Sequence, residues 1–214
     1  MMKTLLYITC NSKPETLSAS KTVGRELVEE FLKANTDYRL NEVDLYEMKL
    51  PRLKYKYFEN RNKLIGQEAY NKLTEEDQKE VDRIKELAIE FKNADCYVIA
   101  TPMWSILFPA PLKEYLDCII QNDITIKISR ERVEGLLDDK KRSMVYIQSS
   151  GGSIPLLLDK KMNHGGNYIK DIFKFLGIKD FHEVLVDGTG FTEEEEHKAV
   201  EKGKKDVQKL VKNL

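Results

Sequence analysis

A continuous apolar run that ends at a proline constrains the fold of this chain more than any other segment. Residues 96–100 read Cys-Tyr-Val-Ile-Ala, and Thr101, Pro102, Met103 and the only tryptophan, Trp104, follow directly. A strand that is apolar on both faces is typical of a parallel sheet covered by helices. Ligands of open parallel sheets bind beyond the carboxyl ends of the strands. Trp104 is therefore predicted to lie at a ligand-binding edge.

Small polar residues follow two further predicted strands. The run at residues 3–9 leads into a polar loop that contains Asn11 and ends in Ser18-Ala19-Ser20, and the run at residues 142–148 ends in Ser149-Ser150-Gly151-Gly152. Hydroxyls and glycines also satisfy ordinary turns and helix caps. Each loop alone is therefore weak evidence for a ligand site. The position of all three loops at strand ends makes such a site a stronger prediction.

Predicted strands alternate with predicted helices along the whole chain. Helical spacing of apolar residues follows Ser18, the capping box at residues 74–77 and Pro109, and further helices are expected at residues 154–176 and from Thr192. The remaining strands are expected at residues 38–44 and 183–186. This alternation predicts one α/β domain over residues 1–214, with a doubly wound parallel sheet of five strands in the flavodoxin-like order 2-1-3-4-5.

Two connections are longer than such a sheet requires. They span residues 51–73 and residues 121–141, and neither has a clear assignment from its pattern. Long connections in compact domains are more often functional or partner-covering than idle. We therefore expect them to contribute to a homodimer interface.

Charge and cysteine content narrow the class of partner. The chain has 35 Lys and Arg against 36 Asp and Glu, with a formal net charge of -1 and no basic segment, so binding to nucleic acid or to an anionic membrane is disfavoured. Three irregularly spaced cysteines fit neither a disulfide framework nor a zinc site. Neither a secretory leader nor a membrane-length apolar run is found. We expect a cytoplasmic protein with a small-molecule ligand and no metal.

The chain lacks the glycine-rich motifs that usually bind nucleotide phosphates, so a phosphate would have to be bound in another way. Neither Gly-x-Gly-x-x-Gly nor a P-loop follows the first strand. Ser18, Ala19 and Ser20 instead open a helix, where free N–H groups attract an anion. This suits the monophosphate of FMN, whose ring would lie between the backbone of residues 104–106 and the glycines at 151 and 152. In isolation, a Ser-x-Ser is usually a helix cap and a tryptophan is usually core, but their combination favours a cofactor site.

Several of these motifs, in this order, resemble the FMN-dependent NADH:quinone oxidoreductases that are also called azoreductases. The resemblance rests on Ser18-Ala19-Ser20, residues 101–104, residues 109–117 and residues 148–152, and it extends to residues 134–137 and 175–178. It implies a flavodoxin-like homodimer that carries FMN and reduces quinones or azo compounds with a reduced nicotinamide. It also implies the following cofactor-binding residues: Asn11, Ser18, Ala19, Ser20, Pro102, Met103, Trp104, Ser105, Ile106, Ser149, Ser150, Gly151 and Gly152.

The chain departs from the family pattern at five positions. Ser105-Ile106 stands where Asn-Phe is common, Ser150 stands where Arg is frequent, and Ile126 and Ile128 replace aromatic residues in a segment that the partner contributes. These changes affect substrate preference and cofactor affinity. The type of reaction is not affected.

The expected reaction is a ping-pong transfer of two electrons, in which NADH or NADPH and then the acceptor use one site. The cofactor carries the chemistry, so no side chain is assigned as a general acid. FAD could replace FMN on these residues alone. The first alternative is a flavodoxin-type electron carrier, although such a carrier would be expected to present a strongly acidic docking face. A phosphoester hydrolase is a weaker alternative, because the strand ends lack a His/Asp/Glu cluster.

Overall fold

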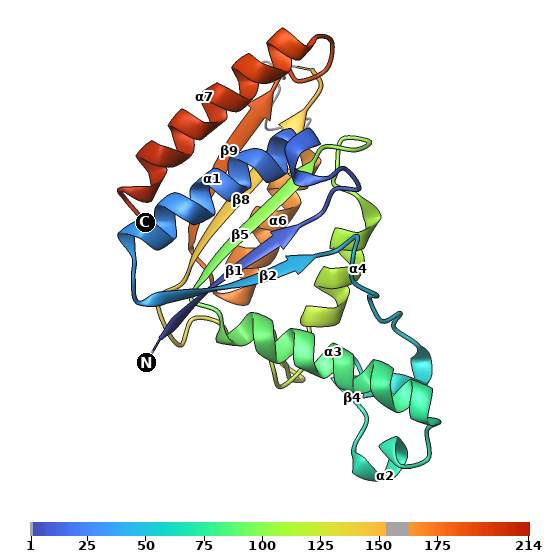
Figure 1. Cartoon of the computed structure of the whole chain (residues 1–214). Helices are drawn as coiled ribbons and strands as arrows, with labels where there is room; N and C mark the ends of the chain where they lie inside the picture. Colours follow the sequence, from blue (N-terminus) through green and yellow to red (C-terminus); the bar gives the residue numbers. More distant parts are fainter. Residues whose placement is uncertain (1, 153–162) are drawn as a thin grey trace.

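A computed structural model describes residues 2–152 and 163–214, and its centre is one parallel sheet (Figure 1). The strand at residues 96–102 occupies the middle of this sheet, and every one of its residues is buried. The five strands of the sheet are β1 (Lys3–Thr9), β2 (Tyr38–Asp44), β5 (Cys96–Pro102), β8 (Ser143–Ser150) and β9 (Asp180–Asp187).

The strand order is β2-β1-β5-β8-β9, and all four pairings are parallel. These labels differ from the predicted 2-1-3-4-5, because the described chain also forms four short strands in two separate hairpins. Counted within the large sheet alone, the second strand lies outside the first, and the remaining three follow on the other side. The flavodoxin-like α/β architecture therefore stands, whereas the strand numbering has to include the hairpins.

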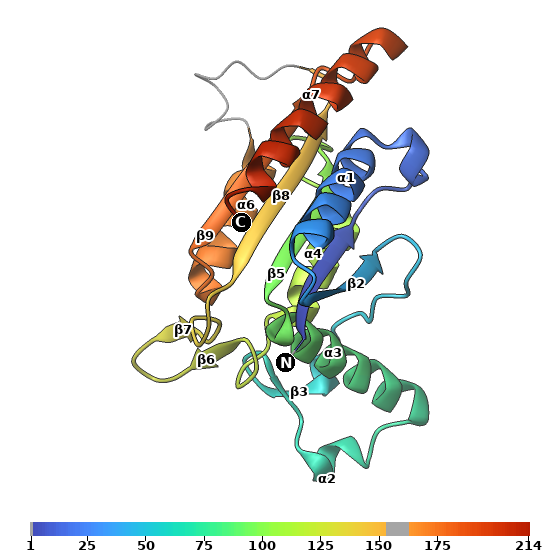
Figure 2. The ribbon, with the colours of Figure 1, turned by 60° about the vertical axis from the view of Figure 1, so that its left-hand side comes forward.

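Helices cover both faces of the sheet (Figure 2). Alternate residues of β1 point to opposite faces, so Leu5 and Tyr7 join one core cluster and Leu6 and Ile8 the other. The first cluster is covered by α1 (Ala19–Ala34) and α7 (Glu193–Val211), and the second by α3 (Glu75–Asn93), α4 (Ala110–Ile119) and α6 (His164–Leu176). This double burial explains the apolar runs of the central strands.

Three helices start at a hydroxyl cap, and the caps at Ser18 and Thr74 were predicted. The hydroxyls of Ser18, Thr74 and Thr192 accept hydrogen bonds from N–H groups in the first turns of α1, α3 and α7. A short turn of 3₁₀ helix, η1 (Glu15–Leu17), precedes α1. Helix α6 begins at His164, and the part of the expected helix at residues 154–162 lies outside the described residues.

The first long connection is held to α3 by a buried carboxylate. Asp77 accepts hydrogen bonds from the Tyr57 hydroxyl at 2.7 Å and from Lys54 Nζ at 3.2 Å, and it also pairs with Lys56. These bonds, with that from Lys56 contributing most, hold the pKa of Asp77 below its usual range. The connection contains η2 (Tyr55–Tyr57), β3 (Phe58–Asn60), β4 (Lys63–Leu64) and α2 (Gln67–Tyr70).

The second long connection forms a hairpin that packs on the end of α6. Its strands are β6 (Ile126–Ile128) and β7 (Val133–Gly135), which pair in antiparallel register. A Cβ on Gly135 would lie 2.2 Å from the carbonyl oxygen of Phe175, so only glycine fits this contact. Nowhere in the described chain is a helix long and apolar enough to span a bilayer.

Candidate functional site

A cleft at the carboxyl ends of β1, β5 and β8 brings the three predicted loops together. Nine of the predicted residues line it, namely Asn11, Ser18, Ala19, Pro102, Met103, Trp104, Ser149, Ser150 and Gly151. The other four predicted residues, Ser20, Ser105, Ile106 and Gly152, are not among the lining residues. The cleft is also lined by Ser12, Lys13, Leu17, Thr189 and Glu196, which the sequence analysis did not assign.

The start of α1 forms one end of the cleft. Ser18 Oγ accepts a hydrogen bond from the Asn11 side-chain amide at 2.8 Å and lies 3.3 Å from Ser20 Oγ. The first turn of α1 contains no acidic residue, so no carboxylate of the helix itself neutralises the partial positive charge of the helix start. Backbone N–H groups and hydroxyls at such a position suit an anion, and a phosphate in particular.

Trp104 begins a tight turn on the opposite side of the cleft. The N–H and carbonyl groups of Trp104 and Leu107 pair at 3.1 and 2.9 Å, and the two residues between them have positive φ angles of 50° at Ser105 and 59° at Ile106. Left-handed backbone is strained for a β-branched residue such as Ile106, and strain of this kind clusters at ligand-binding sites. The turn therefore holds Trp104 in a defined position at the cleft.

The exposure of Trp104 distinguishes its two possible roles. The side chain is 46% exposed, and Tyr46 approaches its ring edge-on at 6.4 Å between centroids. A core tryptophan would be almost fully buried, whereas a platform for a flat ligand has one free face. Trp104 is therefore a residue of the cleft wall.

Gly151, directly after β8, lies against the loop that leads into α7. A Cβ on Gly190 would lie 2.6 Å from the carbonyl oxygen of Gly151, so the two backbones are in direct contact. The N–H groups of Gly188 and Thr189 bond to the Ser150 carbonyl at 3.0 and 3.1 Å. Met103 N–H in turn bonds to the Ser149 carbonyl at 2.7 Å. The floor of the cleft is thus built from backbone that is fixed on both sides.

Comparisons with known proteins identify the family of the chain. A family model for the flavodoxin-like fold matches residues 3–211. The FMN-dependent NADH:quinone oxidoreductase of Clostridium botulinum (strain Alaska E43) is 53% identical, and that of Ruminiclostridium cellulolyticum is 48% identical, each over 100% of both chains. The chain belongs to this family. An FMN-dependent NADH-azoreductase from Bacillus anthracis, solved in complex with FMN, superposes with a TM-score of 0.84 at 27% identity over 99% of each chain.

Among the described residues that line the cleft, only Lys13 and Glu196 carry ionisable side chains. None of the chain's three histidines lines the cleft as the described residues form it, and no cluster of metal-ligating side chains occurs in the described ranges. Cys10 is buried near the first loop, and burial raises the pKa of its thiol to about 12. The thiol is thus protonated at neutral pH and is no nucleophile.

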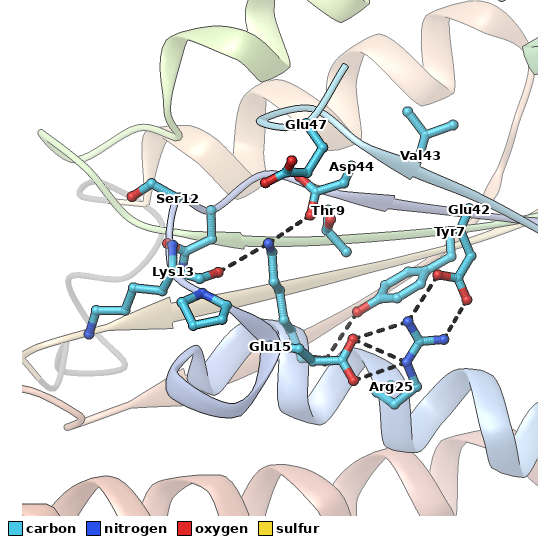
Figure 3. Close-up of a pocket in the computed structure, with 13 residues that line it drawn as sticks. Tyr7, Thr9, Ser12, Lys13, Glu15, Arg25, Glu42, Val43, Asp44 and Glu47 are labelled. Atoms are coloured by element: carbon cyan, nitrogen blue, oxygen red, sulfur yellow. Dashed lines mark hydrogen bonds and ion pairs between the residues drawn. The ribbon is translucent and has the colours of Figure 1, made fainter.

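A neighbouring cavity beside β2 shares Asn11, Ser12 and Lys13 with the cleft but has different chemistry (Figure 3). Lys21 Nζ pairs with Asp44 at 2.8 Å, and Arg25 pairs with both Glu15 and Glu42. Its two inner cations are therefore neutralised by carboxylates of the same cavity. The cleft, with the open start of α1, is the better site for a phosphate.

The two isoleucines of the β6–β7 hairpin, Ile126 and Ile128, differ in their exposure to solvent. Ile126 is only 3% exposed and packs into the core of its own chain, whereas Ile128 is half-buried. Of these two departures from the family pattern, only Ile128 remains accessible to a partner.

Proposed function

We propose that this protein is an FMN-dependent oxidoreductase that takes two electrons from NADH and passes them to a quinone or an azo compound. The observation that carries the proposal is the cleft in which three strand-end loops combine an anion site, an aromatic wall and a glycine floor. Relatives at 48 to 53% identity over the full length have this activity in their names.

The residues of the cleft fit FMN. Ser18, Ala19 and Ser20 would hold the phosphate at the start of α1, with Asn11 fixing the Ser18 hydroxyl. The ring would lie between residues 102–106 and residues 149–152, where Gly151 lets the backbone approach closely. When bound, FMN supplies the centre that accepts a hydride and delivers electrons. The side chains orient the ring and shield it from water.

One exposed face of the cleft serves both substrates in turn. Trp104 forms one wall, and its free surface suits stacking of either a nicotinamide or a planar acceptor. Because both substrates use the same place, the first product leaves before the acceptor enters, and the kinetics are ping-pong. The family membership does not favour the electron-carrier alternative.

Anaerobic stopped-flow spectroscopy tests the proposal directly. We expect NADH to bleach the visible flavin band of the purified protein, and a quinone or an azo dye to restore it in a separate reaction. Steady-state rates at several fixed quinone concentrations should give parallel double-reciprocal lines. A bound flavin that NADH does not reduce, or intersecting lines, would refute the proposed mechanism.

We propose in addition that the active form is a homodimer. The cleft of one chain, as the described residues form it, has a cavity volume of about 210 Å³. Ligand pockets usually measure about 300–1,000 Å³, so the described residues of one chain form only part of such a pocket, and we infer that a second chain contributes to it. Ile106 and Leu107 beside the cleft are 48% and 37% exposed, as expected for apolar residues that a partner covers. The two long connections supply further surface for such contacts.

Light scattering at micromolar concentration should give the mass of two chains. The same sample should carry one flavin per chain and full activity. A monomeric mass with intact activity would contradict the dimer but not the chemistry. The three described cysteines are free and buried, which is compatible with the reducing cytoplasm that we propose as the compartment.

A further inference from the structure

The helices α1 and α7 run side by side in the same direction and begin at the same end of the sheet (Figures 1 and 2). A Cβ on Gly203 of α7 would lie 2.9 Å from a methyl group of Val23 of α1, so the helices are in close contact. Farther along, Gln208 donates a hydrogen bond to Glu26 at 2.7 Å. The starts of both helices therefore lie next to the cleft.

The two helix starts carry opposite charge. The first turn of α1 has no acidic residue, whereas the first turn of α7 consists of Glu193, Glu194, Glu195 and Glu196. A helix start carries roughly half a positive charge, which the N–H groups of α1 offer to a ligand. At α7 the glutamates more than neutralise it. Of two adjacent helix starts, only one is suited to an anion.

A second hollow continues from the cleft between these helix starts. It shares Ser18, Ala19 and Glu196 with the cleft and has a cavity volume of about 320 Å³. Its lining includes Glu193, Glu201 and Lys204, and Lys204 pairs with Glu201 at 3.1 Å. Within the described part of the chain, neither Glu193 nor Glu196 has a Lys or Arg at ion-pair distance. The hollow is therefore acidic.

We propose that Glu193 and Glu196 select FMN and exclude FAD. The inference rests on the proposed placement of the FMN phosphate at the start of α1. FAD extends that phosphate by a second phosphate and an adenosine, and the hollow between α1 and α7 is the space that continues from this point. There the second phosphate meets two carboxylates, which repel it. The selection that we propose is therefore electrostatic.

Paired glutamine variants test this assignment on protein freed of its flavin. The dissociation constants of FMN and FAD are measured by quenching of flavin fluorescence at low ionic strength for the wild type, for Glu193→Gln with Glu196→Gln, and for Glu194→Gln with Glu195→Gln. The control pair removes the same charge from the same turn but lies outside both hollows. The control also removes the ion pair between Glu194 and Lys198 at 2.6 Å, so circular dichroism of both variants checks that the helix is retained.

We expect the ratio of the FAD to the FMN dissociation constant to fall about tenfold in the first pair and to stay within about twofold of the wild type in the control. The difference should shrink at high salt. An unchanged ratio in the first pair, or an equal change in the control, would overturn the assignment. A wild type that binds neither flavin would instead refute the proposed function.

Discussion

Replacement of Ser18 by aspartate should lower the affinity for FMN at least hundredfold relative to replacement by asparagine. Both residues are good helix caps and have nearly the same shape, so the start of α1 is preserved in both variants. They differ by one negative charge at the proposed phosphate position. Two unit charges at 4 Å repel by about 4 kcal/mol near a protein surface, and a hundredfold change requires only about 2.7 kcal/mol.

Titration of flavin-free protein with FMN gives both dissociation constants. Circular dichroism of the two variants controls for folding, since Ser18 is buried and accepts the bond from Lys21 N–H at 3.3 Å. Equal FMN affinities in two folded variants would show that the phosphate binds elsewhere.

Trp104→Ala should alter electron transfer several-fold while changing stability little. Truncation of a core aromatic residue costs about 3–5 kcal/mol, but the Trp104 side chain is 46% exposed, and we expect a loss below about 1.5 kcal/mol. The proposed flavin ring loses its aromatic neighbour, so the reduction by NADH, the oxidation by quinone, or both should change in rate.

The two half-reactions are followed separately by stopped flow, and stability is measured by urea denaturation. Tyr46→Phe is a matched control, because it keeps an aromatic ring beside Trp104. A folded Trp104→Ala protein with normal rates in both half-reactions would remove Trp104 from the site.

The sheet and the helix caps were predictable because their signals are local. Apolar runs such as residues 96–100 are explained by burial on both faces, and Ser18, Thr74 and Thr192 cap helices as their residue types require. The two hairpins were not predicted. Their strands have only two or three residues, too few for a period of two to be recognised.

The candidate site was predictable where it follows a strand directly. Asn11, Trp104 and Ser149 line the cleft because parallel strands end at one edge. Thr189 was missed although it follows β9, and its hydrogen bonds to the Ser150 carbonyl hold it at the cleft. Glu196 was missed because it reaches the cleft through the packing of α7 on α1, which no local pattern encodes. The four glutamates at the start of α7 could have indicated a role for Glu196 at the site. Acidic residues stabilise any helix start, however, so this pattern alone does not indicate a site.

A crystal structure of this protein with FMN would show where the phosphate binds. We expect phosphate oxygens within hydrogen-bond distance of the N–H groups and hydroxyls at residues 18–20, with the ring between residues 102–106 and 149–152. A phosphate bound instead in the neighbouring cavity beside Lys21 and Asp44, or a ring away from Trp104, would contradict this placement.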